Sequence, residues 1–237
     1  MTDAGVALVT GACGGIGGAA AVAFREAGFE VVGADREAGT DVTADVATAE
    51  GARRAVEAAV ERGSLRVVFT AHGISGRDLG DGPVAECTEE GWDAVLDTNL
   101  RSTFLVCKYA VPRLAEAGGG AIVTLGSVLG LVGGDADFDT AAYAASKAGV
   151  VGLTRAIAVR YAAQGIRANV VAPGLIATRM SGRAQEDVRI RARLRDLQPL
   201  TADFGRPKDV AQAALYLAQA EFVTGTVLVV DGGWTAK

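Results

Sequence analysis

The sequence predicts an α/β protein: a doubly wound parallel sheet with helices on both faces, forming a single domain over residues 1–237. Three observations lead to this fold. Short β-branched runs alternate with longer Ala-rich stretches, several of the runs are apolar at every position, and a glycine-rich turn follows the first run. Strands that are apolar throughout are typical of parallel sheets buried on both faces. Alternation of strand and helix is typical of three-layer, Rossmann-like architectures.

The elements follow from these runs in chain order. We expect strands at 6–10, 30–34, 66–71, 121–125, 167–171 and 226–230. We expect helices near 15–27, 49–62, 88–117, 140–163, 183–197 and 207–219. The irregular stretches 72–87, 128–139 and 173–182 follow strand ends, which is where open α/β sheets bind ligands.

Composition excludes several classes of protein. The chain has 237 residues, 50% of them hydrophobic and 22% charged, with a net charge of −5, so we expect a folded chain without a basic stripe for nucleic acid or anionic membranes. No run approaches the roughly 18 apolar residues of a membrane span. The three scattered cysteines, Cys13, Cys87 and Cys107, form no metal motif and predict reduced thiols in a cytoplasmic protein without a metal site.

The turn after the first strand has the composition of a phosphate-binding loop. It contains Gly11, Gly15, Ile16 and Gly17 and leads directly into an Ala-rich helix. Glycines there let backbone N–H groups and the helix N-terminus approach a pyrophosphate. The alternative is that these glycines only make a tight turn. The strand before the loop and the helix after it favour a dinucleotide site.

The second strand ends in a carboxylate, Asp35, which lies 18 residues after Gly17. This spacing is close to that of an acid that binds the adenosine ribose. A 2′-phosphate beside Asp35 would meet like-charge repulsion, so the sequence favours NAD over NADP. Arg36 is the contrary observation, because an arginine there can bind a 2′-phosphate. A capping or turn role is the other alternative for Asp35.

Tyr143 and Lys147 lie four residues apart on a predicted helix, so both side chains share one face. Moving a phenol pKa from about 10 to about 7 takes about 4 kcal/mol. An ammonium about 4 Å away, at an effective dielectric of about 20, supplies about that much. Tyr143 beside Lys147 therefore suits acid–base exchange with an alcohol or a ketone. The same spacing also arises on solvated helix faces, so it points to catalysis only together with the glycine loop.

In combination these motifs resemble the short-chain dehydrogenase/reductase family, over residues 5–234. The matching landmarks are T-G-x-x-x-G-I-G at 10–17, Asp35, Asp45-Val46, Asn99, Ser127, Tyr143-x-x-x-Lys147, Pro173-Gly174 with Thr178, and V-T-G-T-V-L-V-V-D-G-G at 223–233.

The resemblance implies a role for each matching position. Ser127 would orient the substrate oxygen and Tyr143 would exchange the proton. Lys147 would bind the nicotinamide ribose and depress the tyrosine pKa, and Asn99 would fix a helix bend and a water of the proton relay. The remaining positions expected at the cofactor are Arg36, Asp45, Val46, Gly73, Pro173, Gly174, Ile176 and Thr178.

The sequence departs from the family pattern in two places before the catalytic helix. Only nine residues separate Asp35 from Asp45, too few for a crossover helix, so we expect a short or poorly paired third strand. The adenine contact is then either Asp45-Val46 or Asp41-Val42. Thr70-Ala71-His72-Gly73 replaces an N-N-A-G type motif, and we interpret His72 as a cofactor-side or packing residue rather than a catalytic base.

The two expected walls of the substrate cleft are strongly charged. Ser127 and Tyr143 lie 16 residues apart, a few more than is usual in the family, and the added stretch contains Asp135, Asp137 and Asp139. We favour a solvated acidic loop there, the alternative being contact with a cationic or polyhydroxylated substrate. The opposite wall, about 175–204, is expected to act as a lid with its charged side in water. Its arginines are Arg179, Arg183, Arg189, Arg191, Arg193 and Arg195.

The expected activity is interconversion of a secondary alcohol and a ketone by direct hydride transfer to or from NAD(H). The alternatives are an NADPH-dependent ketoacyl-thioester reductase and a non-catalytic, nucleotide-binding redox sensor. A sugar-nucleotide epimerase would need a further substrate domain. The resemblance also implies a homotetramer or homodimer acting on a small-molecule substrate.

Overall fold

The computed structural model of the chain describes residues 4–236 and contains a seven-stranded parallel sheet. The strands are β1 (Val6–Thr10), β2 (Glu30–Asp35), β3 (Val42–Thr43), β4 (Leu65–Thr70), β5 (Gly120–Leu125), β6 (Ile166–Pro173) and β7 (Val227–Val230). Their order is β3-β2-β1-β4-β5-β6-β7, so the winding direction reverses between β1 and β4. The doubly wound fold predicted from the sequence is confirmed, and the reversal opens a crevice at the carboxyl ends of these two strands.

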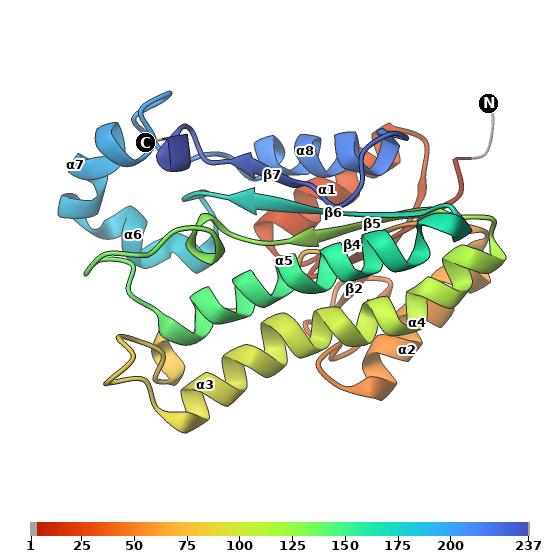
Figure 1. The fold of residues 1–237 in the computed structure, drawn as a ribbon, viewed down its shortest axis with the longest axis horizontal. Coiled ribbons are helices and arrows are strands. Elements are labelled where there is room, and N and C mark those ends of the chain that lie inside the picture. Colours follow the sequence, from red (N-terminus) through yellow and green to blue (C-terminus); the bar gives the residue numbers. More distant parts are fainter. Residues whose placement is uncertain (1–3, 237) are drawn as a thin grey trace.

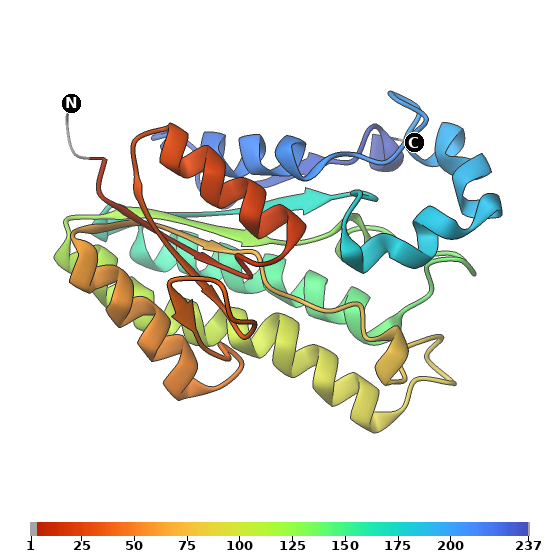
Figure 2. The same ribbon diagram turned by 180° about the vertical axis from the view of Figure 1, so that it is seen from behind.

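Helices cover both faces of the sheet (Figures 1 and 2). One face carries α2 (Ala49–Arg62), α4 (Ser102–Glu116) and α5 (Ala141–Tyr161), and the other carries α1 (Gly15–Glu26) and α8 (Pro207–Gln219). Side chains alternate between the two layers, as the strand period of two requires. Leu8 packs with the α2/α4/α5 core, whereas Ala7 and Val9 pack with the α1/α8 core.

The third strand is short, as predicted, because no helix connects β2 to β3. Residues 36–41 join them, and only Ala34↔Val42 and Asp35↔Thr43 pair. A connection this short cannot carry a full parallel crossover, which takes a dozen residues or more. Pairing therefore stops after two residues.

Two predicted helices are interrupted. The helix expected over 88–117 is α3 (Glu89–Leu96), a π-helical turn η2 (Asp97–Arg101) and α4. The helix expected over 183–197 is α6 (Gly182–Glu186) and α7 (Val188–Leu197). The second interruption occurs because the Asp187 side chain caps α7, accepting from the backbone N–H groups of Arg189 and Ile190 at 2.8 and 3.3 Å.

Short helical turns complete the structure: η1 (Arg77–Leu79), η3 (Val128–Gly130), η4 (Ala162–Gln164), η5 (Arg179–Ser181) and η6 (Trp234–Ala236). Helices α6 and α7 lie beyond the carboxyl ends of the strands, toward which the β6 arrow points in Figure 1. They pack there over a small apolar cluster of Phe138, Ala184, Ile190 and Leu197. Within residues 4–236, none of the helices combines the length and apolar character needed to cross a membrane.

Candidate active site

A cavity of about 530 Å³ lies at the crevice between β1 and β4. Sequence reasoning expected seventeen residues at the cofactor or the reacting atoms, and sixteen of them line this one cavity. The exception is Asn99, which is fully buried behind the cavity wall. The structure therefore brings together residues from the ends of six strands and the starts of two helices.

The glycine loop forms the floor of the cavity and has no room for side chains. Gly11 has a φ of +69°, a conformation that favours glycine. A Cβ on Gly17 would lie 2.1 Å from the carbonyl oxygen of Gly11. No side chain caps the N-terminus of α1, so its first N–H groups keep their capacity to bind an anion. The loop has the shape and the donors that a pyrophosphate requires.

Asp35 and Arg36 lie on the rim at the end of β2. The Asp35 carboxylate accepts from the backbone N–H groups of Cys13 and Glu37 at 3.0 and 3.1 Å. Of the two acidic pairs considered for the adenine contact, Asp45 and Val46 line the cavity. Asp41 instead points to the sheet, where it accepts from the N–H of Gly33 at 2.8 Å.

The segment after β4 is held by His72, which bridges two hydroxyl groups. Its Nδ1 lies 2.5 Å from Thr10 Oγ1 and its Nε2 lies 2.6 Å from Ser102 Oγ. Ser102 donates its own proton to the carbonyl of Thr98, so it accepts from Nε2–H, and Thr10 donates to Nδ1. Burial, followed by the charge of Lys147, lowers the His72 pKa from 6.5 to about 3. The ring is therefore a neutral packing group, in line with the sequence interpretation.

Asn99 lies in the π-helical turn η2 and supports the loop after β4. Its Oδ1 accepts from the N–H of Ile74 at 2.8 Å, and its Nδ2 donates to the carbonyl of Ile74 at 3.0 Å. The same amide donates to Ser146 Oγ at 3.1 Å. A Cβ on Gly73 would lie 3.0 Å from Asn99 Oδ1, so this loop packs closely against the amide. The π-turn supplies the helix bend expected at Asn99.

Tyr143, Ser127 and Lys147 converge at the β5 side of the cavity. The Ser127 side chain lies beside the Tyr143 phenol and acts to lower its pKa. Lys147 Nζ lies 5.7 Å from the centroid of the tyrosine ring and donates to the carbonyl of Leu125 at 2.8 Å. Burial lowers the Lys147 pKa to about 8. These three residues place a proton donor, a hydroxyl and a cation around one point.

The expected depression of the tyrosine pKa is absent from the chain alone. Burial raises the pKa of Tyr143, and the neighbouring Ser127 side chain only partly opposes this rise. The physical reason lies in Lys147, whose ammonium is itself buried and hydrogen-bonded to a backbone carbonyl rather than to the phenol. The phenol is therefore protonated at neutral pH in the chain without ligands.

The end of β6 forms the remaining wall with Pro173, Gly174, Ile176 and Thr178. Gln198, which is 2% exposed, fixes this wall by accepting from the N–H of Leu175 at 2.6 Å. Sequence reasoning missed Gln198 because it lies 23 residues further along the chain and belongs to no local motif.

Asp81 is a second residue that sequence reasoning missed. Its buried carboxylate accepts from the backbone N–H groups of Ala142 and Tyr143 at 2.9 and 2.8 Å. It thus caps α5 from a distant loop, while Thr140 at the N-cap position makes no side-chain capping bond. The only local signal was the Gly-Asp-Gly turn at 80–82.

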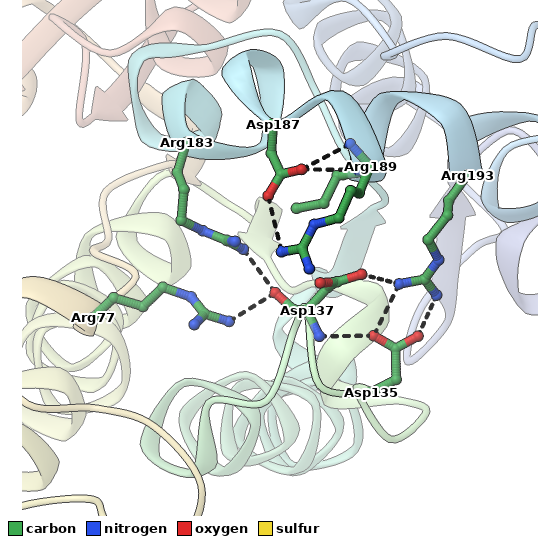
Figure 3. A network of polar contacts seen from close by, with 8 residues as sticks. Arg77, Asp135, Asp137, Arg183, Asp187, Arg189 and Arg193 are labelled. Carbon is green, nitrogen blue, oxygen red and sulfur yellow. Dashed lines mark hydrogen bonds and ion pairs between the residues drawn. The ribbon is translucent and has the colours of Figure 1, made fainter.

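The acidic loop is exposed over residues 131–136, in line with the expectation of a solvated loop, and it is in addition bound to the opposite wall. Arg193 of α7 pairs with the carboxylates of both Asp135 and Asp137 (Figure 3). Its guanidinium also lies 5.9 Å from the centroid of the Phe138 ring. Five of the six lid arginines are exposed, as expected, and only Arg193 is half-buried. Two of the exposed ones, Arg179 and Arg183, also line the cavity. Opposite charges on the two walls explain the pairing.

The proteins that this chain is similar to are described as reductases and dehydrogenases. Residues 11–235 match a family model described as enoyl-(acyl carrier protein) reductase. The chain is 40% identical to cis-4-hydroxycyclohexanecarboxylate dehydrogenase of Sinomonas cyclohexanicum, over 98% of this chain and 96% of that protein. It is 38% identical to cyclohexanol dehydrogenase of an Acinetobacter species, over 98% and 95%. A solved structure from Beutenbergia cavernae, a candidate NAD(P)-dependent gluconate 5-dehydrogenase with NADP at low occupancy, aligns with a TM-score of 0.88 at 33% identity, over 100% and 98%.

Proposed function

Because the chain belongs to the short-chain dehydrogenase/reductase family of nicotinamide-dependent oxidoreductases, we propose that it interconverts a secondary alcohol and a ketone with NAD(H). One observation carries the proposal. The Ser127–Tyr143–Lys147 group lines the same cavity as the glycine loop and Asp35, across the reversal point of the sheet.

The glycine loop is the proposed pyrophosphate site, with Asp35 at the adenosine ribose and Asp45-Val46 at the adenine. The nicotinamide end is assigned to the wall formed by Pro173, Gly174, Ile176 and Thr178. When bound, the nicotinamide supplies hydride acceptance or donation. The protein supplies position and a partly dry environment.

Tyr143 is the proposed general acid toward the ketone oxygen and the general base toward the alcohol. The Ser127 hydroxyl, beside the phenol in the same cavity, orients that oxygen. The Lys147 ammonium holds a positive charge near the ring and stabilises the phenolate that forms transiently. Asn99 keeps the helix bend that positions this group.

Replacing Tyr143 with Phe tests the proposed acid/base. We expect turnover to fall at least about 100-fold while the Kd for NADH changes only a few-fold, because general acid–base catalysis typically supplies 10²–10⁴. Steady-state rates and NADH fluorescence titration give the two values. Turnover above about one hundredth of the parent would exclude Tyr143 from proton transfer.

The preference for NAD is supported by the Asp35 carboxylate on the rim, which would repel a 2′-phosphate. Arg36 on the same rim and the NADP of the Beutenbergia cavernae structure argue the other way. We expect kcat/KM with NADH to exceed that with NADPH by about tenfold or more, the effect of about 1.4 kcal/mol. Asp35→Ser is expected to lower the ratio of kcat/KM with NADH to kcat/KM with NADPH. A tenfold preference for NADPH in the parent would overturn the assignment.

The two named relatives act on ring alcohols, so ring ketones form the first substrate panel. We propose cyclohexanone, 4-oxocyclohexanecarboxylate and an acetoacetyl thioester of coenzyme A, followed by NADH absorbance. Reduction of a ring ketone supports the proposed function. Turnover of the thioester alone would support the ketoacyl-thioester reductase instead, and binding of NADH without any turnover would support a nucleotide-binding sensor.

We further propose that segment 175–204 acts as a lid and that the chain forms a homodimer or homotetramer through α4 and α5. Phe104 on α4 is 45% exposed and Val159 on α5 is 83% exposed, so both helices present apolar side chains outward. Light scattering coupled to gel filtration measures the assembly. A monomer at micromolar concentration would contradict it.

A further inference from the structure

Two arginines from different elements, both lining the cavity, meet at one backbone carbonyl. Arg77 of η1 donates to the carbonyl oxygen of Asp137 at 3.1 Å, and Arg183 of α6 donates to the same oxygen at 2.7 Å. Figure 3 shows both side chains directed at this carbonyl oxygen, Arg77 from η1 and Arg183 from α6. Both line the cavity, Arg77 half-buried and Arg183 exposed.

The charges of these two guanidinium groups lack a direct counterion. Among the ion pairs of residues 4–236, neither Arg77 nor Arg183 takes part. Burial and the charge of Arg183 lower the pKa of Arg77. A neutral carbonyl cannot offset two positive charges, so the arrangement favours an added anion.

The carboxylates that attract Arg77 from a greater distance are Asp81, Asp139 and Asp137. Two of them have other partners. Asp81 accepts from the first turn of α5, and the Asp137 carboxylate pairs with Arg193. The third, Asp139, forms no ion pair with Arg77, Arg183 or any other cation of residues 4–236. Neither arginine is thus within ion-pairing distance of a carboxylate of the described chain, and an anionic ligand in the cavity can supply that direct counterion.

The cavity that the two arginines line also has apolar side chains. Leu129, Phe138, Met180 and Trp234 line the same cavity as Tyr143. A ligand filling this space would place an apolar skeleton against these groups, with one end at the phenol and the other at the arginines. Two donors that share one oxygen acceptor are also close enough for the two oxygens of a carboxylate to bridge.

We propose that Arg77 and Arg183 form a carboxylate-binding subsite, so that the substrate is an apolar hydroxy acid or keto acid whose carboxylate lies away from the reacting carbon. This proposal rests on the proposed function, because it identifies the substrate class of that same cavity. In this proposal the two arginines select substrates that carry a negative charge.

The test compares 4-oxocyclohexanecarboxylate with its methyl ester, which differs only in the negative charge. We expect the parent to favour the acid at least about tenfold in kcat/KM, as a charge-assisted hydrogen bond allows. Arg77→Gln and Arg183→Gln should each lower kcat/KM for the acid about tenfold and change the ester less than about twofold. Glutamine keeps a donor for the Asp137 carbonyl, so the loop contact is retained.

Arg191→Gln is the matched control. Arg191 lies on the same wall, donates to a backbone carbonyl like Arg183, and is exposed outside the cavity lining. Arg191→Gln should change kcat/KM for neither the acid nor its methyl ester. A role of Arg77 and Arg183 in holding the loop alone would lower the rates with acid and ester equally, and that result would overturn the subsite.

A binding measurement separates this inference from the proposed function. Cyclohexanecarboxylate, which cannot be reduced, should raise the melting temperature of the parent with or without NAD, and its methyl ester should not. The shift should vanish in Arg77→Gln. If ring ketones are inert but this shift appears, the proposed function fails and the subsite stands. If ketones are reduced without preference for the acid and no shift appears, the subsite fails and the proposed function stands.

Discussion

At the scale of single residues, the buried ammonium of Lys147 lowers the stability of the folded chain, and the proposed chemistry requires this ammonium. Lys147 is 3% exposed, and burial lowers its pKa from 10.5 to about 8. It stays charged at neutral pH, although a buried cation without a carboxylate partner destabilises the folded chain. Such a cost is typical of residues kept for function rather than stability.

Replacing Lys147 with Met should remove this cost along with the activity. The folded chain binds fewer protons than the unfolded chain between pH 8 and 10.5, so the cost is fully present below pH 8 and fades as the pH rises. We expect Lys147→Met to raise the free energy of unfolding without ligands at pH 7 by on the order of 1–3 kcal/mol. Urea unfolding at pH 7 and pH 10 measures it. A variant less stable than the parent at pH 7 would contradict this account.

His72 predicts a rise of stability with pH as Lys147 does, but in a lower pH range. Its pKa in the folded chain, about 3, is below its ordinary 6.5, so the unfolded chain binds the extra proton between these values. Its contribution to stability is complete above pH 6.5 and is lost as the pH falls toward 3. We expect His72→Gln to be less stable at pH 7, by about 1–3 kcal/mol for the lost bridge. Its melting temperature should also fall less steeply between pH 6.5 and 4.5. Parallel curves for parent and variant would rule out His72 as the source.

At the scale of elements, α5 depends on a cap that the rest of the chain provides. Tyr143 lies in the first turn of this helix, where Asp81 binds its backbone N–H. A carboxylate at a helix N-terminus satisfies free donors and interacts favourably with the helix dipole. The cap therefore positions the catalytic helix as well as stabilising it.

Replacing Asp81 with Ala should destabilise the chain by about 1–3 kcal/mol and lower kcat more than it changes the Kd for NADH. Asp81→Asn, which keeps one acceptor oxygen, should lose less stability and less kcat than Asp81→Ala. Urea unfolding and steady-state kinetics report the two effects. Equal kcat in parent and Asp81→Ala would show that the cap contributes to stability alone.

At the scale of the whole molecule, the two walls of the substrate cleft are joined by the Arg193 pairs. The loop is also held by the edge contact of Phe138 with Trp234 of η6, whose ring centroids lie 5.1 Å apart. The loop 131–139 and helix α7 thus move together or separate together. The ion pairs are partly exposed, so they contribute little to overall stability.

Arg193→Gln should open this contact without unfolding the chain. We expect the free energy of unfolding to change by less than about 1 kcal/mol. Chymotrypsin cleavage within 131–139 should become several-fold faster, because the loop loses its partner on α7. An Arg195→Gln control on the same helix should behave as the parent. Unchanged cleavage in Arg193→Gln would mean that the aromatic contact alone holds the loop.

Local signals in the sequence were enough to predict the sheet, the glycine loop and the Tyr143–Lys147 face, since each is set by neighbours along the chain. The remaining features depend on residues distant in sequence. Asp81 contacts α5 from 61 residues away, and Arg193 pairs with Asp137 from 56 residues away. The helix bend at Asn99 was expected from the family resemblance alone, because one extra residue in a turn barely disturbs the apolar pattern of a long helix.

The two-residue length of β3 also bears on how the chain behaves at high concentration. The outer edge of a sheet presents unpaired N–H and C=O groups that can recruit a strand from another molecule, and long flat edges do so most readily. An edge formed by Val42 and Thr43 alone offers too short a template for this. Because no crossover helix precedes β3, the sheet edge at β3 is too short to pair readily with a strand of another molecule.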